Sequence, residues 1–180
     1  MEHAIQPSTS SSALIQSRAS DLMLSLMSYK RWADAALLAA ARSLPDSFPE
    51  LERGYVLAII RHYHTVDCIF RAHLIGVTHE YTSPNPSEPA TLSELQQRVA
   101  TIDDWYVGHA SKLDERELGQ VLNVKFTDGQ EQTLSRSDIL LHVSQHGTGH
   151  RGQVALLMQM RGIQPPPDRF PNYLRSVSRH

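Results

Sequence analysis

The chain has 180 residues, of which 41% are hydrophobic and 20% charged, and its formal net charge is −2 with the histidines neutral. This length fits one domain with its own hydrophobic core. No block of Lys and Arg stands out, which argues against a nucleic-acid partner, and no apolar run approaches the roughly 20 residues of a membrane span.

The N-terminal segment and the cysteine content bear on the compartment. Residues 1–19 lack both the basic start and the apolar stretch of a secretion signal. Cys68 is the single cysteine, which excludes an internal disulfide and fits a reducing environment. We therefore expect a cytoplasmic protein with a disordered polar tail at residues 1–19 and a single domain at residues 20–175.

Apolar residues repeat at three- and four-residue steps along four segments, which predicts four long helices. The first spans about residues 13–44 and the second about residues 49–76. The third begins at Thr91, where Glu94 completes a capping box, and the fourth spans residues 135–162, with a second cap pattern at its start.

Two further segments lack this helical period. Residues 79–89 contain three prolines and predict a connecting loop. Between Leu118 and Leu134, apolar and polar residues alternate around Asp128-Gly129, a pair typical of a type I′ turn, so a short β-hairpin is expected there. The predicted fold class is therefore all-α, a four-helix bundle with a short β-hairpin before the last long helix.

Ten histidines are the unusual feature of the composition, and they cluster in residues 61–79 and 141–150. A helix turns about 100° per residue, so His62 lies within about 20° of Tyr55 and Ile69. His64 is turned about 160° away and should meet solvent. His73 returns to the face of His62 but about 16 Å further along, too far to share an ion with it. The expected core stripe of this second helix is Leu51, Tyr55, Ile59, Val66 and Ile69.

On the fourth helix, His146 and His150 lie one turn apart in the centre of the apolar stripe. This i, i+4 spacing lets two imidazoles converge on one metal ion. His142 lies one turn earlier, about 40° off the stripe. It could be a fourth ligand, but we expect a residue that holds a ligand in place or a surface residue. The stripe itself is Ile139, Val143, Val154 and Leu157.

A single histidine on an apolar stripe is more often a hydrogen-bonded core residue than a metal ligand. Three buried together are different, because each costs on the order of 1–3 kcal/mol if it is unsatisfied, and one ion satisfies all three. The spacing therefore favours a metal site on His62, His146 and His150. It requires the second and fourth helices to be neighbours.

Three glycines, Gly147, Gly149 and Gly152, lie inside the fourth helix, and each costs it about 1 kcal/mol relative to alanine. Three explanations stay open. A neighbouring helix approaches closely, the glycines leave space for a ligand above the metal, or this segment is a loop.

The segment His146-Gly-Thr-Gly-His150-Arg151-Gly152-Gln153 resembles the DinB family of metal-dependent enzymes. The segments Tyr29-Lys-Arg-Trp32-Ala-Asp and His62-Tyr-His-Thr-Val-Asp67 resemble the family's first-helix and second-helix motifs. Phe126 to Gly129 with Ser135-Arg136 resembles the hairpin before its last helix. As a whole, the likeness to the family spans roughly Leu22 to Leu174.

This resemblance implies a four-helix bundle, commonly a homodimer, with one zinc or nickel ion on His62, His146 and His150. Relatives in the same superfamily are transferases or isomerases that use a low-molecular-weight thiol such as bacillithiol, mycothiol or glutathione, although many DinB members have no assigned reaction. The family often has a larger residue at the position of Gly149, which puts the local pocket shape in question.

Three imidazole ligands leave a coordination position open, which is typical of catalytic sites. A water held there can reach a pKa of about 7, or a substrate thiol can bind as its thiolate. We therefore expect an enzyme acting on a small-molecule substrate, either a thiol-dependent transferase or a hydrolase. The alternative is a non-catalytic, stress-associated metal-binding protein.

Residues close to the three histidines in the sequence could have supporting roles at the site. Arg61, Arg71 and Arg151 could bind a thiol cofactor's carboxylates. Arg151 and Gln153 could line the pocket or hydrogen-bond neighbouring helices.

No general base for a hydrolase could be named. Asp67 lies about 140° around its helix from His62, and Asp138 fits a helix start. Cys68 as a nucleophile is a third hypothesis, although it fits a small core residue better. Tyr29 and Trp32 should pack in the core.

Overall fold

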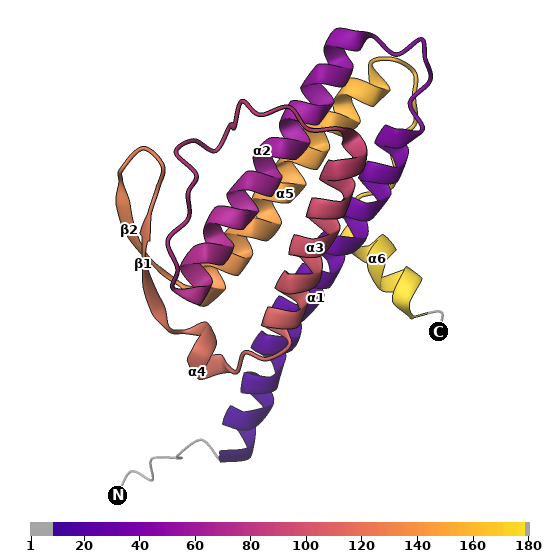
Figure 1. Cartoon of the computed structure of the whole chain (residues 1–180). Coiled ribbons are helices and arrows are strands. Elements are labelled where there is room, and N and C mark those ends of the chain that lie inside the picture. The colour runs from indigo at the N-terminus through magenta and orange to yellow at the C-terminus, as the bar shows by residue number, and fades with distance from the viewer. Residues whose placement is uncertain (1–8, 179–180) are drawn as a thin grey trace, which may run out of the picture.

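The computed structural model describes the backbone of residues 9–178 and the side chains of residues 19–178. Within this range four long helices form a bundle, with a two-stranded hairpin before the last of them (Figure 1). The helices are α1 (Thr9–Arg42), α2 (Glu50–Ile75), α3 (Leu92–Ala110), α4 (Glu115–Leu118), α5 (Arg136–Gln159) and α6 (Phe170–Val177). The strands are β1 (Val121–Lys125) and β2 (Glu131–Ser135). The predicted fold class is confirmed.

The first helix starts earlier than its apolar pattern indicates. Helix α1 begins at Thr9, so residues 9–19, which we assigned to a disordered tail, have a helical backbone. In Figure 1 this end of α1 extends beyond the other long helices. Residues 1–8 of the expected tail lie outside the described residues.

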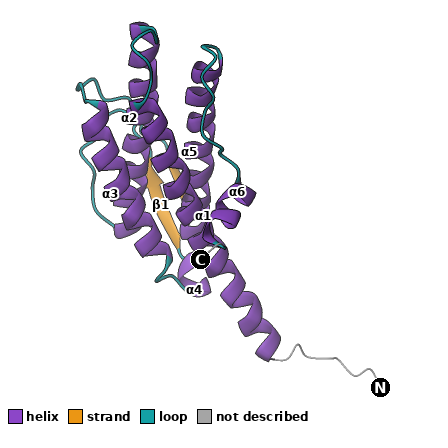
Figure 2. Cartoon of the chain, turned by 90° about the vertical axis from the view of Figure 1, so that its right-hand side faces the viewer, coloured by secondary structure: helices purple, strands orange, loops and turns teal. Residues whose placement is uncertain are grey.

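The long helices run alongside one another, with α1 against α3 and α5, and α2 against α5 and α3 (Figure 2). The neighbouring positions of α2 and α5 meet the condition for a shared histidine site. None of the described helices has an apolar stretch long enough to cross a lipid bilayer.

Both predicted helix starts carry capping boxes. At α3 the Thr91 side chain accepts a hydrogen bond from the Glu94 backbone N–H, and the Glu94 carboxylate accepts one from the Thr91 N–H. Ser135 and Asp138 repeat this arrangement at α5, so Asp138 is a helix-start residue as predicted. These contacts satisfy backbone donors that have no partner within the helix.

The hairpin lies where it was predicted, but its turn does not have the predicted type. The strands pair antiparallel from Val121 opposite Ser135 to Lys125 opposite Glu131. The Phe126 carbonyl accepts a hydrogen bond from the Gly129 N–H, and Gly129 has φ +86°. A type I′ turn needs positive φ at Asp128 as well, and no described non-glycine residue has one. The connection is therefore a longer loop with one left-handed glycine.

The buried face of α2 is rotated from the predicted stripe. Leu51 and Tyr55, expected in the core, are 71% and 54% exposed, and His64, expected in solvent, is buried. Val66 and Ile69 are buried as predicted, and the observed face also includes Asp67, which an apolar pattern leaves out. His64 is covered because α2 also meets α3 and the loop that follows α2, to which Arg61 and His62 bond. The core side chains of α2 include Val56, Ile60, Tyr63, Asp67, Phe70 and Leu74.

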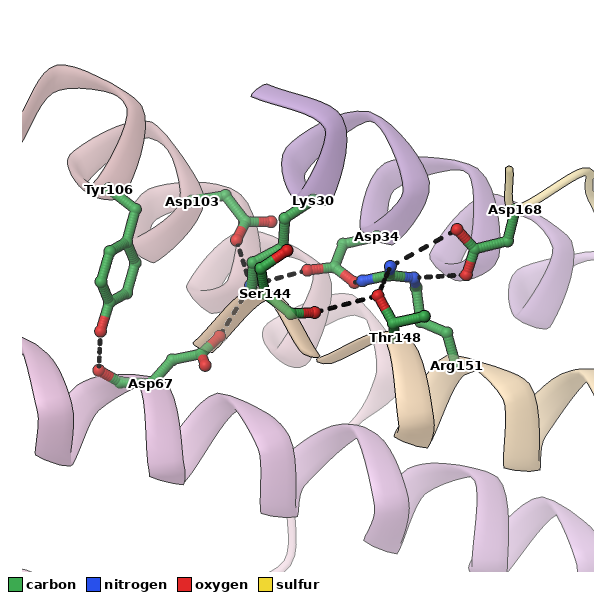
Figure 3. Close-up of polar contacts among 9 residues, drawn as sticks. All are labelled: Lys30, Asp34, Asp67, Asp103, Tyr106, Ser144, Thr148, Arg151 and Asp168. Carbon is green, nitrogen blue, oxygen red and sulfur yellow. Dashed lines mark hydrogen bonds and ion pairs between the residues drawn. The ribbon is translucent and has the colours of Figure 1, made fainter. Parts of the chain in front are cut away.

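The centre of the bundle is charged, which the sequence did not lead us to expect (Figure 3). The Lys30 ammonium lies 2.8 Å from Asp34 Oδ2, 2.7 Å from Asp67 Oδ2 and 2.6 Å from Asp103 Oδ1, and all four side chains are buried. The Asp67 contact is close, but its geometry is not that of a hydrogen bond, and Asp67 Oδ1 has no partner among the described residues.

Arg151 extends this charged cluster to the segment before α6. Its Nη1 lies 2.9 Å from Asp34 Oδ1, and its Nε lies 2.8 Å from Asp168 Oδ2. The Tyr29 hydroxyl also donates to Asp168, and its buried ring packs edge-on against Phe170. We call this cluster the charged core; it consists of Lys30, Asp34, Asp67, Asp103, Arg151 and Asp168.

Candidate metal centre

Three histidines from two neighbouring helices meet at one point. His62 projects from α2, and His146 and His150 project from successive turns of α5. One ring nitrogen from each lies within 4.8 Å of the other two. His62 Nε2 is 3.2 Å and His150 Nε2 is 3.0 Å from His146 Nε2. Nitrogens bound to one tetrahedral zinc lie roughly 3.3 Å apart, so only a small outward shift of the rings separates these two distances from that geometry.

In two of these rings, the hydrogen-bond partner of Nδ1 shows which ring nitrogen carries the hydrogen. His62 Nδ1 lies 3.1 Å from the Pro84 carbonyl oxygen, an acceptor, so Nδ1 carries the hydrogen and Nε2 presents a lone pair. His150 Nδ1 lies 2.9 Å from Gln153 Oε1, and the same argument applies. Both rings therefore direct lone pairs toward the third histidine.

His146 cannot satisfy both neighbours with a hydrogen of its own. A neutral imidazole has one N–H, and a hydrogen on Nε2 would serve His62 or His150 but not both. With that tautomer, or any other, one lone pair would face another. A cation among the three nitrogens satisfies all of them, so the donor set fits a divalent metal ion. His146 Nδ1 is buried and has no partner among the described residues.

The surroundings of His62 and His146 favour the neutral form of these two rings. Burial, followed by the nearby His150, lowers the pKa of His62 from its usual value. Burial, with His150, His62 and His142 nearby, lowers the pKa of His146 to about 3. Because only a neutral imidazole can bind a metal ion, these shifts favour the ligand form at neutral pH.

The residues predicted around the three histidines take different positions. Gln153 meets His150 directly, as described above. The His142 ring stacks on His146, with centroids 5.4 Å apart, and lies against Phe70, but His142 does not belong to the group of nitrogens that could share an ion. In this position the His142 ring can hold the His146 ring in place.

Arg151 does not line the histidine site. Its side chain turns into the bundle and is held by Asp34 and Asp168, so its role is structural. This position also explains Gly147. A Cβ on Gly147 would lie 3.2 Å from Arg151 Nη1 and 3.4 Å from Lys30 Cε, so the close approach of these buried side chains favours glycine at this position.

The other two glycines of α5 face open space. No atom lies within 4 Å of a Cβ built on Gly149 or Gly152, and α5 continues through all three glycines as one helix. The loop explanation is therefore wrong. Gly149 leaves room beside His150.

The remaining catalytic candidates are not gathered at the histidines. Arg61 donates to the Glu88 carbonyl, and the Arg71 guanidinium lies over the Trp105 ring. Burial raises the pKa of the Cys68 thiol, so it is a poor nucleophile. Asp67 lies in the charged core. The Pro84 carbonyl, which orients His62, was missed because a backbone group in a loop leaves no signal in the sequence.

Taken together, the fold and the three-histidine cluster define a helical-bundle protein with a candidate site for one metal ion. The model of the DinB family matches residues 16–179, and the chain belongs to the DinB family. A crystal structure of a DinB-like protein from Bacillus cereus ATCC 10987 is similar to it, with a TM-score of 0.55 and 18% identity over 77% of this chain and 90% of that one. This likeness concerns the fold. A search of curated protein sequences gives no match.

Proposed function

We propose that this protein is a metal-dependent enzyme of the DinB family, a thiol-dependent transferase that holds one zinc or nickel ion on His62, His146 and His150. The observation that carries the proposal is the convergence of three Nε2 atoms, two of which present lone pairs fixed by outer hydrogen bonds. An ion bound there would act as a Lewis acid with an open position, able to hold a substrate thiol as its thiolate.

The choice of a transferase over a hydrolase rests on the carboxylates. A metal-dependent hydrolase needs a general base close to the bound water. Among the described residues, the group of close ligand atoms contains the three histidines and no Asp or Glu. Three neutral ligands also leave the full charge of a divalent ion to attract a thiolate. A non-catalytic metal-binding protein is the second candidate, favoured by the same lack of a base.

The experiment has two parts. Metal analysis of protein prepared without a histidine tag should find about one zinc or nickel ion per chain. The loaded protein is then incubated with a low-molecular-weight thiol and an electrophilic aryl halide, alongside the variants His146→Ala and His109→Ala. His109 lies on α3 and does not belong to the group of close ligand atoms. We expect thiol conjugation by the wild type and by His109→Ala, in which the three histidines remain, and none by His146→Ala.

A chain that binds one ion but conjugates no faster than His146→Ala contradicts the transferase and supports the non-catalytic candidate. A chain with no bound ion under metal-replete conditions contradicts both. The homodimer and the cytoplasmic location expected above stay predictions, and sedimentation equilibrium would test the first.

A further inference from the structure

A cavity of about 500 Å³ lies between α1, α3 and α6, and its lining includes no residue of α2 or α5, which carry the three histidines. Its walls include the rings of Trp32 and Tyr173, whose centroids are 6.1 Å apart at an angle of 55°. Leu38 and Val99 add apolar surface. Its volume falls in the range of small-molecule sites, and none of the three histidines lines it.

Three charged residues line this cavity. Arg31 and Asp104 form an ion pair at 3.0 Å, and both are substantially exposed, so they largely neutralise each other. The third is Asp103, whose side chain is only 2% exposed. Among the residues that line the cavity, Asp103 is therefore the carboxyl group that no lining cation pairs with.

Asp103 connects the cavity to the charged core. Its Oδ1 accepts a hydrogen bond from Lys30 at 2.6 Å, and it is the carboxyl group of the charged core that lines the cavity. The charged core contains two cations, Lys30 and Arg151, and twice as many carboxyl groups. Fully ionised, it would hold an excess of buried negative charge, which is unfavourable in a low-dielectric interior.

Protons relieve this excess in the free protein. Burial, opposed by Lys30, raises the pKa of Asp67 to about 6 and raises the pKa of Asp103 well above its usual range. A ligand that brings a positive charge to Asp103 would serve the same purpose as a proton. Two aromatic rings beside a carboxylate are also a combination that recognises organic cations.

We propose that this cavity binds a small organic ammonium ion, with its nitrogen at Asp103 and its apolar part against Trp32 and Tyr173. The cation forms a charge-assisted hydrogen bond with the carboxylate and a cation–π contact with the rings. An anion is disfavoured because Arg31, the cation that lines the cavity, is already paired.

The probe is 2-phenylethylammonium, compared with 2-phenylethanol and phenylacetate, which keep the ring but carry no charge or a negative one. Calorimetric titration at pH 7 should give an affinity for the ammonium ion at least about ten-fold higher than for either analogue. Equal affinities for the three compounds would overturn the proposal. So would the absence of binding of the ammonium ion at about 10 mM probe, a concentration well above a millimolar dissociation constant.

Proton release gives a second readout. If the ammonium ion displaces a proton from Asp103, the heat of binding depends on the ionisation enthalpy of the buffer, whereas the neutral alcohol shows no such dependence. A buffer-independent heat for the ammonium ion would contradict the exchange of a proton for the ligand.

Two pairs of variants test the location. Asp103→Asn should weaken binding of the ammonium ion at least about ten-fold, while Asp128→Asn, an exposed aspartate in the hairpin turn, should leave it unchanged. Because Asp103→Asn also alters the charged core, a second pair avoids that residue. Ala100→Phe fills the cavity from an exposed position and should abolish binding, while Ala39→Phe, exposed on α1 outside the cavity, should not. Unchanged binding by folded Ala100→Phe would place the ligand elsewhere and overturn the proposal.

Discussion

His62 Nε2 lies 3.2 Å from His146 Nε2, although 84 residues separate them in the chain. The His62 ring is held from behind by the Pro84 carbonyl, in a loop that connects α2 to α3. Both its position and its tautomer therefore depend on groups outside its own helix. The affinity of such a site for a metal ion depends on the contacts that orient its ligands.

Replacement of Gln153 by alanine should weaken metal binding about 10- to 100-fold, because His150 loses the acceptor that holds its Nδ1–H. Competition with a chromophoric chelator measures the dissociation constant. Gln145→Ala, an exposed glutamine on the same helix, is the matched control and should bind like the wild type. Equal affinities for both variants would mean that Gln153 does not orient His150.

Replacement of Lys30 by methionine should lower the free energy of unfolding by roughly 3–5 kcal/mol, because three buried carboxyl groups lose their shared cation. Arg31→Met breaks an exposed ion pair and should change it by no more than about 1 kcal/mol. Urea unfolding of both variants measures the difference. A similar loss in the two would contradict the importance of the charged core.

Two glycine substitutions on α5 should have opposite effects. Gly147→Ala should destabilise the protein, since its Cβ would press on Arg151 and Lys30, whose ion pairs leave them little freedom to move. Gly152→Ala meets open space and should stabilise the helix by up to about 1 kcal/mol. Thermal unfolding should place the two melting temperatures on either side of the wild type, and the opposite order would be inconsistent with this packing.

The stability of the charged core should depend on pH through Asp67. Its pKa is raised to about 6 in the folded protein, so between the unfolded value of about 3.9 and this value the folded state binds the extra proton. The contribution of this proton is fully present below the unfolded pKa and is lost as the pH rises through 6. Relative to Asp67→Asn, the wild type should therefore gain up to roughly 3 kcal/mol of stability as the pH falls from 8 to about 4.

Urea unfolding of the wild type and Asp67→Asn at several pH values measures this difference. The comparison with the variant cancels much of the titration of other groups. The charges of Lys30 and Asp34 act on the pKa of Asp67, and Asp67 acts on that of Asp103, so the measured midpoint belongs to the cluster. A difference that is constant with pH, or that grows with rising pH, would contradict the raised pKa.

Local patterns in the sequence were sufficient for the four long helices, apart from the start of α1, for the position of the hairpin and for the three histidines, but not for the short helices α4 and α6. Capping boxes at Thr91 and Ser135 and the spacing of His146 and His150 depend on contacts within a few residues, which the chain order determines directly. The turn at Gly129 lies where it was predicted, but its type was wrong because that depends on backbone angles that the dipeptide alone does not impose.

Tertiary structure decided what covers each helix face. Periodicity places residues around a helix but does not say which neighbouring segment covers each face. The predictions for two residues of α2 therefore failed: His64 is buried and Tyr55 is exposed. Arg151, adjacent to His150 in the chain, turns away from the histidine cluster because Asp34, 117 residues distant, offers a buried partner. Ion pairs between such distant residues exist only after the helices pack. The sequence alone therefore determined which histidines could meet, and only the packing of four helices created the charged core and the cavity beside it.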